Sequence, residues 1–254
     1  MPLPPLKDQF DALLRLPSIS CTQADLDQSN LPVVELLASW LNDLGFECRI
    51  LPIANQPGKA NLLASFGSGP GGLVMAGHTD TVPCNPERWQ HDPFALTEAN
   101  NRWYGLGSCD MKGFFPLIIE AVRSYLNQPF KHPLIILATA DEESSMSGAR
   151  ALVAADFSQA RHAIIGEPTG MRPIRLHKGI MMERIDIIGQ AGHSSDPSLG
   201  HNAMEAMHAV IGDLLQLRGD WQKRWSNPLF GVPTPTLNLG CIHGGDNPNR
   251  ICAK

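Results

Sequence analysis

The sequence predicts an α/β layer fold whose strands are covered on both faces. Strand-like and helix-like segments alternate along its first two thirds, which is the pattern of an α/β protein. The strand-like segments, such as residues 133–140, are continuous apolar runs and therefore typical of strands buried on both sides. With 254 residues, of which 43% are hydrophobic, the chain can fill one large core or two smaller ones.

The first helix is predicted over residues 32–45. Val34, Leu37 and Leu41 recur there at helical spacing, and Gly45 supplies a stop. A glycine-rich turn, GSGPGG, then separates two strand-like runs. The elements of this part follow in order: strands over 61–67 and 72–77, a helix over 111–127, a strand over 133–140, a helix over 145–155 and a strand over 162–166.

The pattern changes near Gly179, where we place a domain boundary. Residues 181–189 alternate between apolar and polar side chains, a helix is predicted over about 202–217, and residues 234–243 are again strand-like. We therefore expect domains over 1–179 and 180–254, the second with an antiparallel sheet. Because the sequence stops inside a strand-like stretch, we expect both domains to be the front part of something longer.

Composition excludes several classes of protein. The net charge of −5 gives no reason to expect nucleic acid or an anionic membrane as a partner. No stretch of 18 apolar residues occurs, and the N-terminus lacks the apolar core of a signal peptide. The six cysteines form no CxxC pair, so we interpret them as reduced thiols of a cytoplasmic protein.

Acidic residues and one histidine follow three of the predicted strands directly. Sites in open α/β sheets form just beyond the carboxyl ends of the strands, so these side chains are expected to converge on one crevice. A further acid lies in YGLGSCDMKG, before the 111–127 helix. The candidates are His78 and Asp80 after the first strand, Asp141, Glu142 and Glu143 after the second, Glu167 after the third, and Asp110.

This combination of side chains suits a divalent metal centre. Converging carboxylates repel one another unless a cation or a proton lies between them. One histidine with several carboxylates is a donor set for zinc, cobalt or manganese. Two ions that share a carboxylate would polarise a carbonyl and activate water, and a carboxylate left off the ions would act as general base.

Each residue also has a simpler interpretation. Asp110 could cap the next helix, the acids of 141–143 could begin the following helix, His78 could be a core histidine, and Glu167 could be a turn residue. These readings do not explain why the residues cluster at three strand ends. In GLGSCD an aspartate occupies the last position of a dinucleotide-binding pattern, where it would oppose a pyrophosphate. No GxSxG or HExxH motif occurs, and Cys109 has no evident base partner.

Four linked motifs, GHTDTVP, YGLGSCDMKGF, ATADEESSMSGA and IIGEPTG, resemble in order and spacing the dinuclear metallohydrolase family of aminoacylases and glutamate carboxypeptidases. The resemblance continues through GQAGHSSDPSLGHNAMEAM and PTPTLNLGCIHGGDNPNRIC, and so covers essentially the whole chain. It implies a zinc-peptidase-like α/β/α catalytic domain with an inserted, smaller α+β lid or dimerisation domain, both incomplete at the C-terminus.

The resemblance also implies a role for each candidate. The implied metal ligands are His78 and Glu167 on a first ion, Glu143 on a second, and Asp110 bridging the two. Asp80, two residues from His78 on the same strand face, would orient the imidazole. Glu142 would be the general base.

A second group of implied residues lies in the smaller domain. His193 would come from the partner subunit of a homodimer and approach the developing oxyanion, although a plain surface histidine is the alternative reading. Lys178, Asn249 and Arg250 would bind a substrate carboxylate, and Arg250 has the best geometry for it.

The implied activity is removal of the acetyl group from N2-acetyl-L-ornithine, a small N-acylated amino acid, in arginine biosynthesis. A sibling hydrolase that acts on succinyl-diaminopimelate and a non-catalytic fragment are the alternatives. The family holds two ions per subunit, zinc or cobalt. Its last histidine ligand has no counterpart here, since His243 lies in the small-domain stretch, so the second site is expected to be incomplete.

Overall fold

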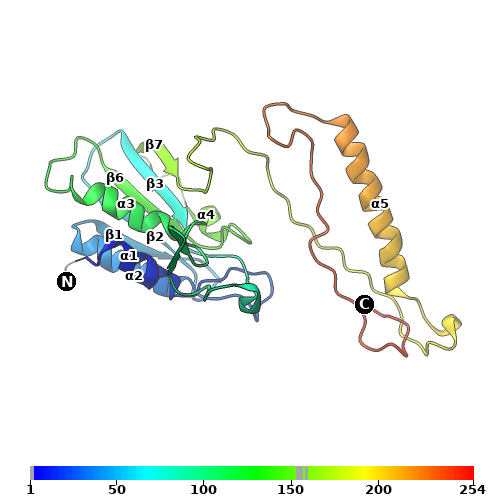
Figure 1. The fold of residues 1–254 in the computed structure, drawn as a ribbon. Coiled ribbons are helices and arrows are strands. Elements are labelled where there is room, and N and C mark those ends of the chain that lie inside the picture. The colour runs from blue at the N-terminus through cyan, green and yellow to red at the C-terminus, as the bar shows by residue number, and fades with distance from the viewer. Residues whose placement is uncertain (1–2, 153–156, 158–159) are drawn as a thin grey trace. The chain divides into compact units, whose positions relative to one another are not determined.

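The computed structural model describes residues 3–152, 157 and 160–254, which form two compact units (Figure 1). The first unit ends at Arg172 and the second runs from Pro173 to Lys254. The predicted domain ranges, 1–179 and 180–254, stay predictions.

The first unit is built on a mixed five-stranded sheet of order β1-β2-β6-β3-β7. Its strands are β1 (Glu47–Pro52), β2 (Ala60–Phe66), β3 (Gly72–His78), β6 (Leu134–Thr139) and β7 (Ala160–Ile165). β3 runs parallel to both β6 and β7, whereas β2 is antiparallel to β1 and β6. The carboxyl ends of three parallel strands therefore lie at one edge of the sheet, and the predicted α/β fold is confirmed.

Three helices cover one face of this sheet: α1 (Leu6–Leu14), α2 (Leu31–Asp43) and α3 (Phe114–Arg123). Their apolar side chains pack on alternate residues of the central strands, such as Leu62 and Ala64 of β2 and Ile136 of β6, in one buried cluster. Burial of this apolar face is the main stabilising contribution to the unit. The structure adds α1 and β1 to the elements expected from the sequence.

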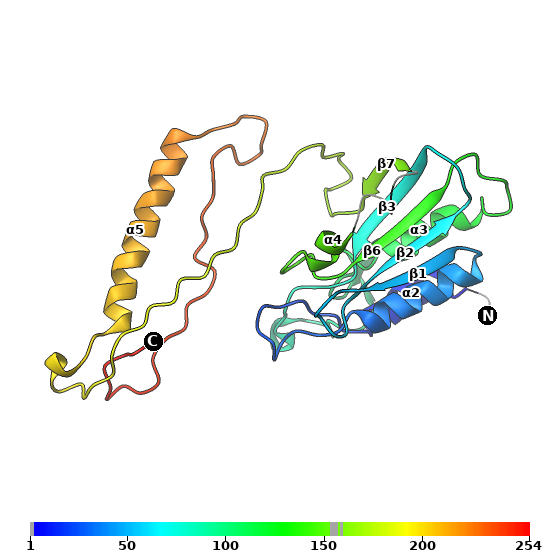
Figure 2. The same ribbon diagram turned by 180° about the vertical axis from the view of Figure 1, so that it is seen from behind.

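The opposite face carries a smaller apolar cluster, made by the intervening strand residues Leu63, Val74, Ile135 and Leu137. Leu152 and Phe157 pack against it. α4 (Ser147–Ala151) lies beyond the carboxyl ends of β3 and β6 (Figure 2). The predicted helix over 145–155 is therefore shorter than expected, and residues 153–155 lie outside the described part of the chain.

Between β3 and α3 the chain forms a short 3-10 turn, η1 (Pro86–Arg88), and the hairpin of β4 (Thr97–Ala99) with β5 (Arg102–Tyr104). The helix predicted over 111–127 begins only at Phe114, because residues 107–113 fold into a loop closed by the Gly113 N–H donating to the Gly107 oxygen at 3.0 Å. Gly107 has φ +86°, which favours glycine, and a Cβ there would lie 2.9 Å from Lys112. This loop carries Asp110.

The second unit contains η3 (Pro197–Leu199) and the long helix α5 (Ala203–Arg224). α5 begins at the Asn202 cap, whose side chain accepts from the Met204 N–H at 3.0 Å. The strands predicted over 181–189 and 234–243 are wrong: the described residues of this unit form only isolated bridges, Gln190 with His201 and His193 with Arg250. Alternation makes a strand only where a neighbour supplies ladder hydrogen bonds, and Met181 and Ile188 are 75% and 81% exposed. Among the described residues, no helix has the length and hydropathy needed to cross a membrane.

Candidate metal centre

The candidate site lies at the carboxyl edge of the three parallel strands. His78 ends β3 and pairs with Thr139 at the end of β6, so the residues that follow both strands are neighbours. Glu167 follows β7, whose Ile165 pairs with Ala76. The potential donor atoms form two overlapping groups, each with its atoms within 4.8 Å of one another: His78, Asp110 and Glu143, and His78, Glu142 and Glu167.

His78 is shared by both groups and is 1% exposed. Its Nε2 lies 3.2 Å from Asp110 Oδ1, 3.8 Å from Glu167 Oε1 and 3.9 Å from Glu142 Oε2. Its Nδ1 lies 2.9 Å from the main-chain oxygen of Asp80, which can only accept a hydrogen bond. Nδ1 is therefore the protonated nitrogen of the neutral ring, and the Nε2 lone pair faces the carboxylates, where a cation would bind it.

Asp80 accepts a hydrogen bond from His78 with its main-chain oxygen and not with its carboxylate. β3 ends at His78, so the expected sharing of a strand face does not apply to Asp80. The Asp80 carboxylate lies 3.7 Å from Nδ1 and instead accepts the main-chain N–H groups of Glu142 and Glu143 at 3.1 and 3.0 Å. It thereby fixes the start of the loop that carries those two glutamates.

Two of the simpler interpretations do not match the structure. Asp110 does not cap α3, because the cap position is Gly113 and no side chain binds the first turn. The acids that follow β6 do not begin a helix, because α4 starts at Ser147 and has no acidic residue in its first turn. The Asp110 side chain is half exposed and faces His78.

Asp141, the first acid after β6, turns away from His78. Its carboxylate accepts from Lys59 Nζ at 2.7 Å, from Ser20 Oγ at 3.0 Å and from Ser147 Oγ at 3.0 Å. The residue has φ +54°, a left-handed conformation that aspartate tolerates better than most residues. This sharp bend sends Asp141 to one side of the loop while Glu142 and Glu143 belong to the donor groups.

Glu143 and Glu167 have pKa values above the ordinary range of a glutamate. The pKa of Glu143 is raised to about 7, first by burial and then by the negative charges of Asp110 and Glu142, against the opposing effect of His78. Burial also raises the pKa of Glu167 above its usual range, and the same neighbouring carboxylates add to this effect while His78 opposes it. Negative charge thus accumulates here beyond what the surroundings balance.

The two buried residues respond to the same surroundings. Burial raises the pKa of Asp80 above its usual range, although the main-chain hydrogen bond from Glu143 and the charge of His78 partly offset this. Burial lowers the pKa of His78, but the charges of Asp80, Glu142 and Glu167 outweigh it and raise the pKa overall.

These observations fit divalent cations. One imidazole with a free lone pair and four carboxylates that repel one another is a donor set for such ions, which would relieve the repulsion. The geometry places Glu142 in a donor group with His78 and Glu167, so its position is compatible with a ligand as well as with a general base.

The remaining expected residues belong to the second unit. His193 pairs with Arg250 in a short antiparallel bridge, and Ser194 N–H donates to the Asn249 oxygen at 3.2 Å, so three of the four lie side by side. Lys178 is separate: its ammonium donates to the main-chain oxygens of Val232 and Thr234 at 3.2 and 3.1 Å. Arg250 Nη1 donates to Asp246 at 2.8 Å.

Sequence reasoning missed the residues that support the loops of the site. Asn61 donates to the Gly148 oxygen at 2.8 Å and accepts from the Ala140 N–H at 3.0 Å, which closes the loop between β6 and α4. Lys59, in the stretch PGKAN, resembles an ordinary solvated loop lysine. Only the antiparallel pairing of β2 with β6, which brings the start of β2 to the carboxyl edge, shows what these side chains contact.

Comparison with known proteins places these observations in a family context. Residues 74–222 match the model described as Peptidase family M20/M25/M40. The chain is 52% identical over 251 residues to the acetylornithine deacetylase of Photorhabdus laumondii subsp. laumondii, covering 99% of this chain and 65% of that protein. It is 54% identical over 251 residues to the acetylornithine deacetylase of Klebsiella pneumoniae, covering 99% and 66%. The chain thus spans about two thirds of these curated relatives.

Solved structures share the fold at lower identity. Human carnosine dipeptidase 1 matches with a TM-score of 0.62 and 21% identity, over 82% of this chain and 50% of that one. A tripeptidase from Staphylococcus aureus subsp. aureus Mu50 matches with a TM-score of 0.57 and 17% identity, over 98% of this chain and 63% of that one.

Proposed function

The chain belongs to peptidase family M20/M25/M40, and from this premise we propose that it is a metal-dependent amide hydrolase that removes the acetyl group from N2-acetyl-L-ornithine. The observation that carries the proposal is the convergence of His78 with four carboxylates at the ends of three parallel strands. The choice of substrate rests on the identity of 52% and 54% to acetylornithine deacetylases over nearly the whole chain.

His78 and Glu167 would hold a first divalent ion, zinc or cobalt, and Glu143 would hold a second, less completely ligated one, with Asp110 shared by both. When bound, such ions supply positive charge that polarises the amide carbonyl and stabilises the anionic transition state. His78 is prepared for this role because the Asp80 main chain already fixes its ring and tautomer.

Glu142 would move the proton. Its side chain is 38% exposed, so solvent and substrate can reach its carboxylate. Its main-chain N–H donates to the Asp80 carboxylate, which fixes the start of the side chain that would do general-base work. Glu142 would accept a proton from the attacking water and deliver it to the departing amine of ornithine.

His193 and its neighbours in the second unit would complete the site from the partner subunit of a homodimer. The bridge between His193 and Arg250 supports this, because it places an imidazole suited to an oxyanion beside a guanidinium suited to a substrate carboxylate. Asn249 lies in the same bridge region, whereas Lys178 is occupied by main-chain oxygens and is the weakest member of the set.

The reaction would serve arginine biosynthesis in the cytoplasm. All six cysteines are free, which is the pattern of a reducing compartment.

The proposal is tested by metal-dependent release of ornithine. Bound metal is first removed from the protein with a chelator. The metal-free protein is then loaded with Zn²⁺ or Co²⁺ and given N2-acetyl-L-ornithine, and the primary amine that is released is measured. We expect any turnover to need the ion and to exceed that on succinyl-diaminopimelate. Faster hydrolysis of the succinylated substrate would assign the sibling activity. Tight metal binding without hydrolysis of either compound would indicate a non-catalytic chain.

A further inference from the structure

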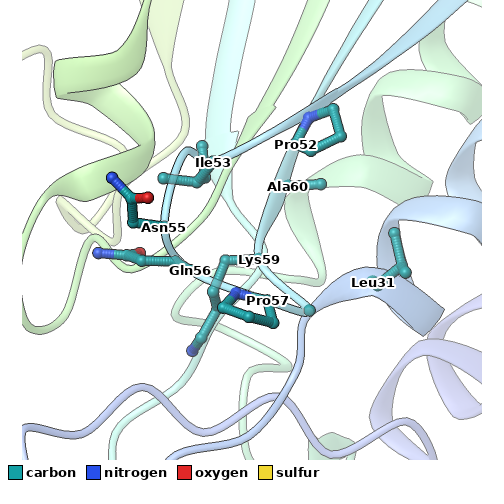
Figure 3. A pocket seen from close by; sticks show the side chains of 9 residues that line it. Leu31, Pro52, Ile53, Asn55, Gln56, Pro57, Lys59 and Ala60 are labelled. Carbon is teal, nitrogen blue, oxygen red and sulfur yellow. The ribbon is translucent and has the colours of Figure 1, made fainter.

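Lys59 is a buried cation that faces the carboxyl edge of the sheet. It lies in the connection between β1 and β2, where it is one of the residues lining a pocket of about 290 Å³ (Figure 3). Its side chain is only 6% exposed. Its ammonium donates to Asp141 Oδ1 at 2.7 Å and to Asp27 Oδ1 at 2.8 Å. No other lysine or arginine among the described residues forms an ion pair with Asp141.

Asp141 is the point through which Lys59 acts. The Asp141 carboxylate is 7% exposed and would be a buried, unbalanced charge without the ammonium. Its other contacts are hydroxyl groups, Ser20 and Ser147, which are neutral. Lys59 is thus the cation that pairs with the Asp141 carboxylate and holds it in place.

The loop after β6 is held from two sides. On one side the Asp80 carboxylate binds the main-chain N–H groups of Glu142 and Glu143. On the other side Lys59 binds Asp141, the residue at the bend. The Asp141 main-chain oxygen accepts from the Met146 N–H at 2.7 Å, which closes the turn. The loop therefore has little freedom to move either glutamate.

We propose that Lys59 is a positioning residue of the metal centre, which through Asp141 sets where Glu142 and Glu143 lie. The inference rests on the proposed function for its catalytic consequence, but its effect on metal binding does not depend on the substrate. Lys59 contacts none of the potential metal donors itself, so its influence passes through the ion pair with Asp141.

The opposite charges of Lys59 and Asp141 stabilise their ion pair beside the metal centre. Loss of Lys59 would leave the buried Asp141 carboxylate without its cation, and the bend at Asp141 would lose one of the contacts that fix it. A shift of this bend would move Glu142 and Glu143, which follow it directly. Removal of a residue that orients a metal ligand without binding the ion typically lowers metal affinity or activity about 10- to 100-fold.

The test compares Lys59→Met, Asp141→Asn and the double variant with the unchanged protein. Lys7→Met is the matched control, because Lys7 forms an ion pair with Glu98 that is 53% exposed on both sides. Co²⁺ affinity, the visible Co²⁺ spectrum, kcat, KM and thermal stability are measured for each. We expect Lys59→Met to lower the affinity for one Co²⁺ ion and to lower kcat, each by about 10- to 100-fold. The Co²⁺ spectrum should change, and KM should stay within about threefold of its value in the unchanged protein.

The double variant separates an effect through Asp141 from a general one. If Lys59 acts through Asp141, the double variant loses no more than about twofold beyond the worse single variant. Additive losses would overturn the proposal. So would a lower thermal stability of Lys59→Met with metal affinity, spectrum and kcat unchanged, since that is the result of a purely structural role.

Two safeguards keep the outcome decisive. If Lys59→Met does not fold, Asp141→Asn is read alone, and unchanged metal affinity in that variant contradicts the proposal. If the unchanged protein binds Co²⁺ but does not hydrolyse acetylornithine, the proposed function fails while affinity and spectrum still decide the role of Lys59.

Discussion

The main-chain oxygen of Asp80 lies 2.9 Å from Nδ1 of His78, while the Asp80 carboxylate lies 3.7 Å away from the same atom. The same residue therefore makes two separable contributions. Its main chain fixes the imidazole, and its side chain binds the N–H groups of Glu142 and Glu143. A substitution of the side chain keeps the main-chain contact to His78 but removes the second contribution, together with the negative charge that acts on His78.

We expect Asp80→Ala to lower the affinity for the ion held by Glu143 more than the affinity for the ion held mainly by His78. The main-chain contact to His78 survives the substitution, whereas the loop start loses its acceptor. The affinity or activity loss should be about 10- to 100-fold, and calorimetric titration of the chelated protein with Zn²⁺ would measure it. Asp25→Ala, at an exposed position, is the control. Complete loss of both ions would show that Asp80 is itself a ligand.

Glu142→Gln and Glu143→Gln should separate the base from the ligand. We expect Glu142→Gln to keep both ions but lower kcat by at least about 100-fold, because the proton acceptor is lost while the shape remains. Glu143→Gln should instead reduce metal content. Elemental analysis and steady-state rates on the two variants provide the measurement. A metal-depleted Glu142→Gln protein would assign Glu142 to the donor group that includes Glu167.

The core of the site followed from the sequence because strand ends are visible in it. His78, Glu143 and Glu167 each follow an apolar run, and parallel strands bring such positions to one edge. The target of the Asp80 carboxylate could not be predicted, because period-two alternation ends with the strand at His78.

Contacts between residues far apart in the chain could not be predicted from the local sequence pattern. Lys59 and Asp141 are 82 positions apart, and only the antiparallel placement of β2 against β6 brings them together. The strands expected over 181–189 and 234–243 failed for the opposite reason. Residues 181–189 alternate and residues 234–243 are strand-like, but a strand also needs a neighbour with matching hydrogen bonds.

The metal-free protein should lose stability as the pH rises from about 4.5 to 7. The pKa of Glu143 is raised to about 7 in the folded state, and the pKa values of Asp80, Glu167 and His78 are also raised. The folded protein then holds protons that the unfolded chain releases, so the free energy of unfolding falls with pH across this window.

Bound metal should reverse this trend, because ions replace the protons. Thermal unfolding of chelated and Zn²⁺-loaded protein at several pH values would measure the difference. We expect the stabilisation by metal to grow with pH and Glu143→Gln to flatten the curve of the chelated protein. A chelated protein that becomes more stable from pH 5 to 7 would contradict the assignment of these carboxylates to one crowded site.

Lys112 should give the opposite pH dependence at higher pH. Its side chain is 1% exposed, and its ammonium donates to the main-chain oxygens of Leu13 and Leu16 at 3.0 and 3.1 Å, tying the end of α1 to the loop of Asp110. Burial lowers the pKa of Lys112 to about 8, below its ordinary value of 10.5. Between these two values the unfolded chain binds a proton that the folded protein does not, so the free energy of unfolding rises with pH by up to about 1.4 kcal/mol per unit.

Lys112→Met should lack this rise, whatever its stability at neutral pH, and urea unfolding from about pH 8 to 10 would show a growing gap between it and the unchanged protein. Lys131→Met, at an exposed position, should keep the rise. Parallel curves for Lys112→Met and the unchanged protein would mean that the buried ammonium keeps its ordinary pKa, as it would if water reached it.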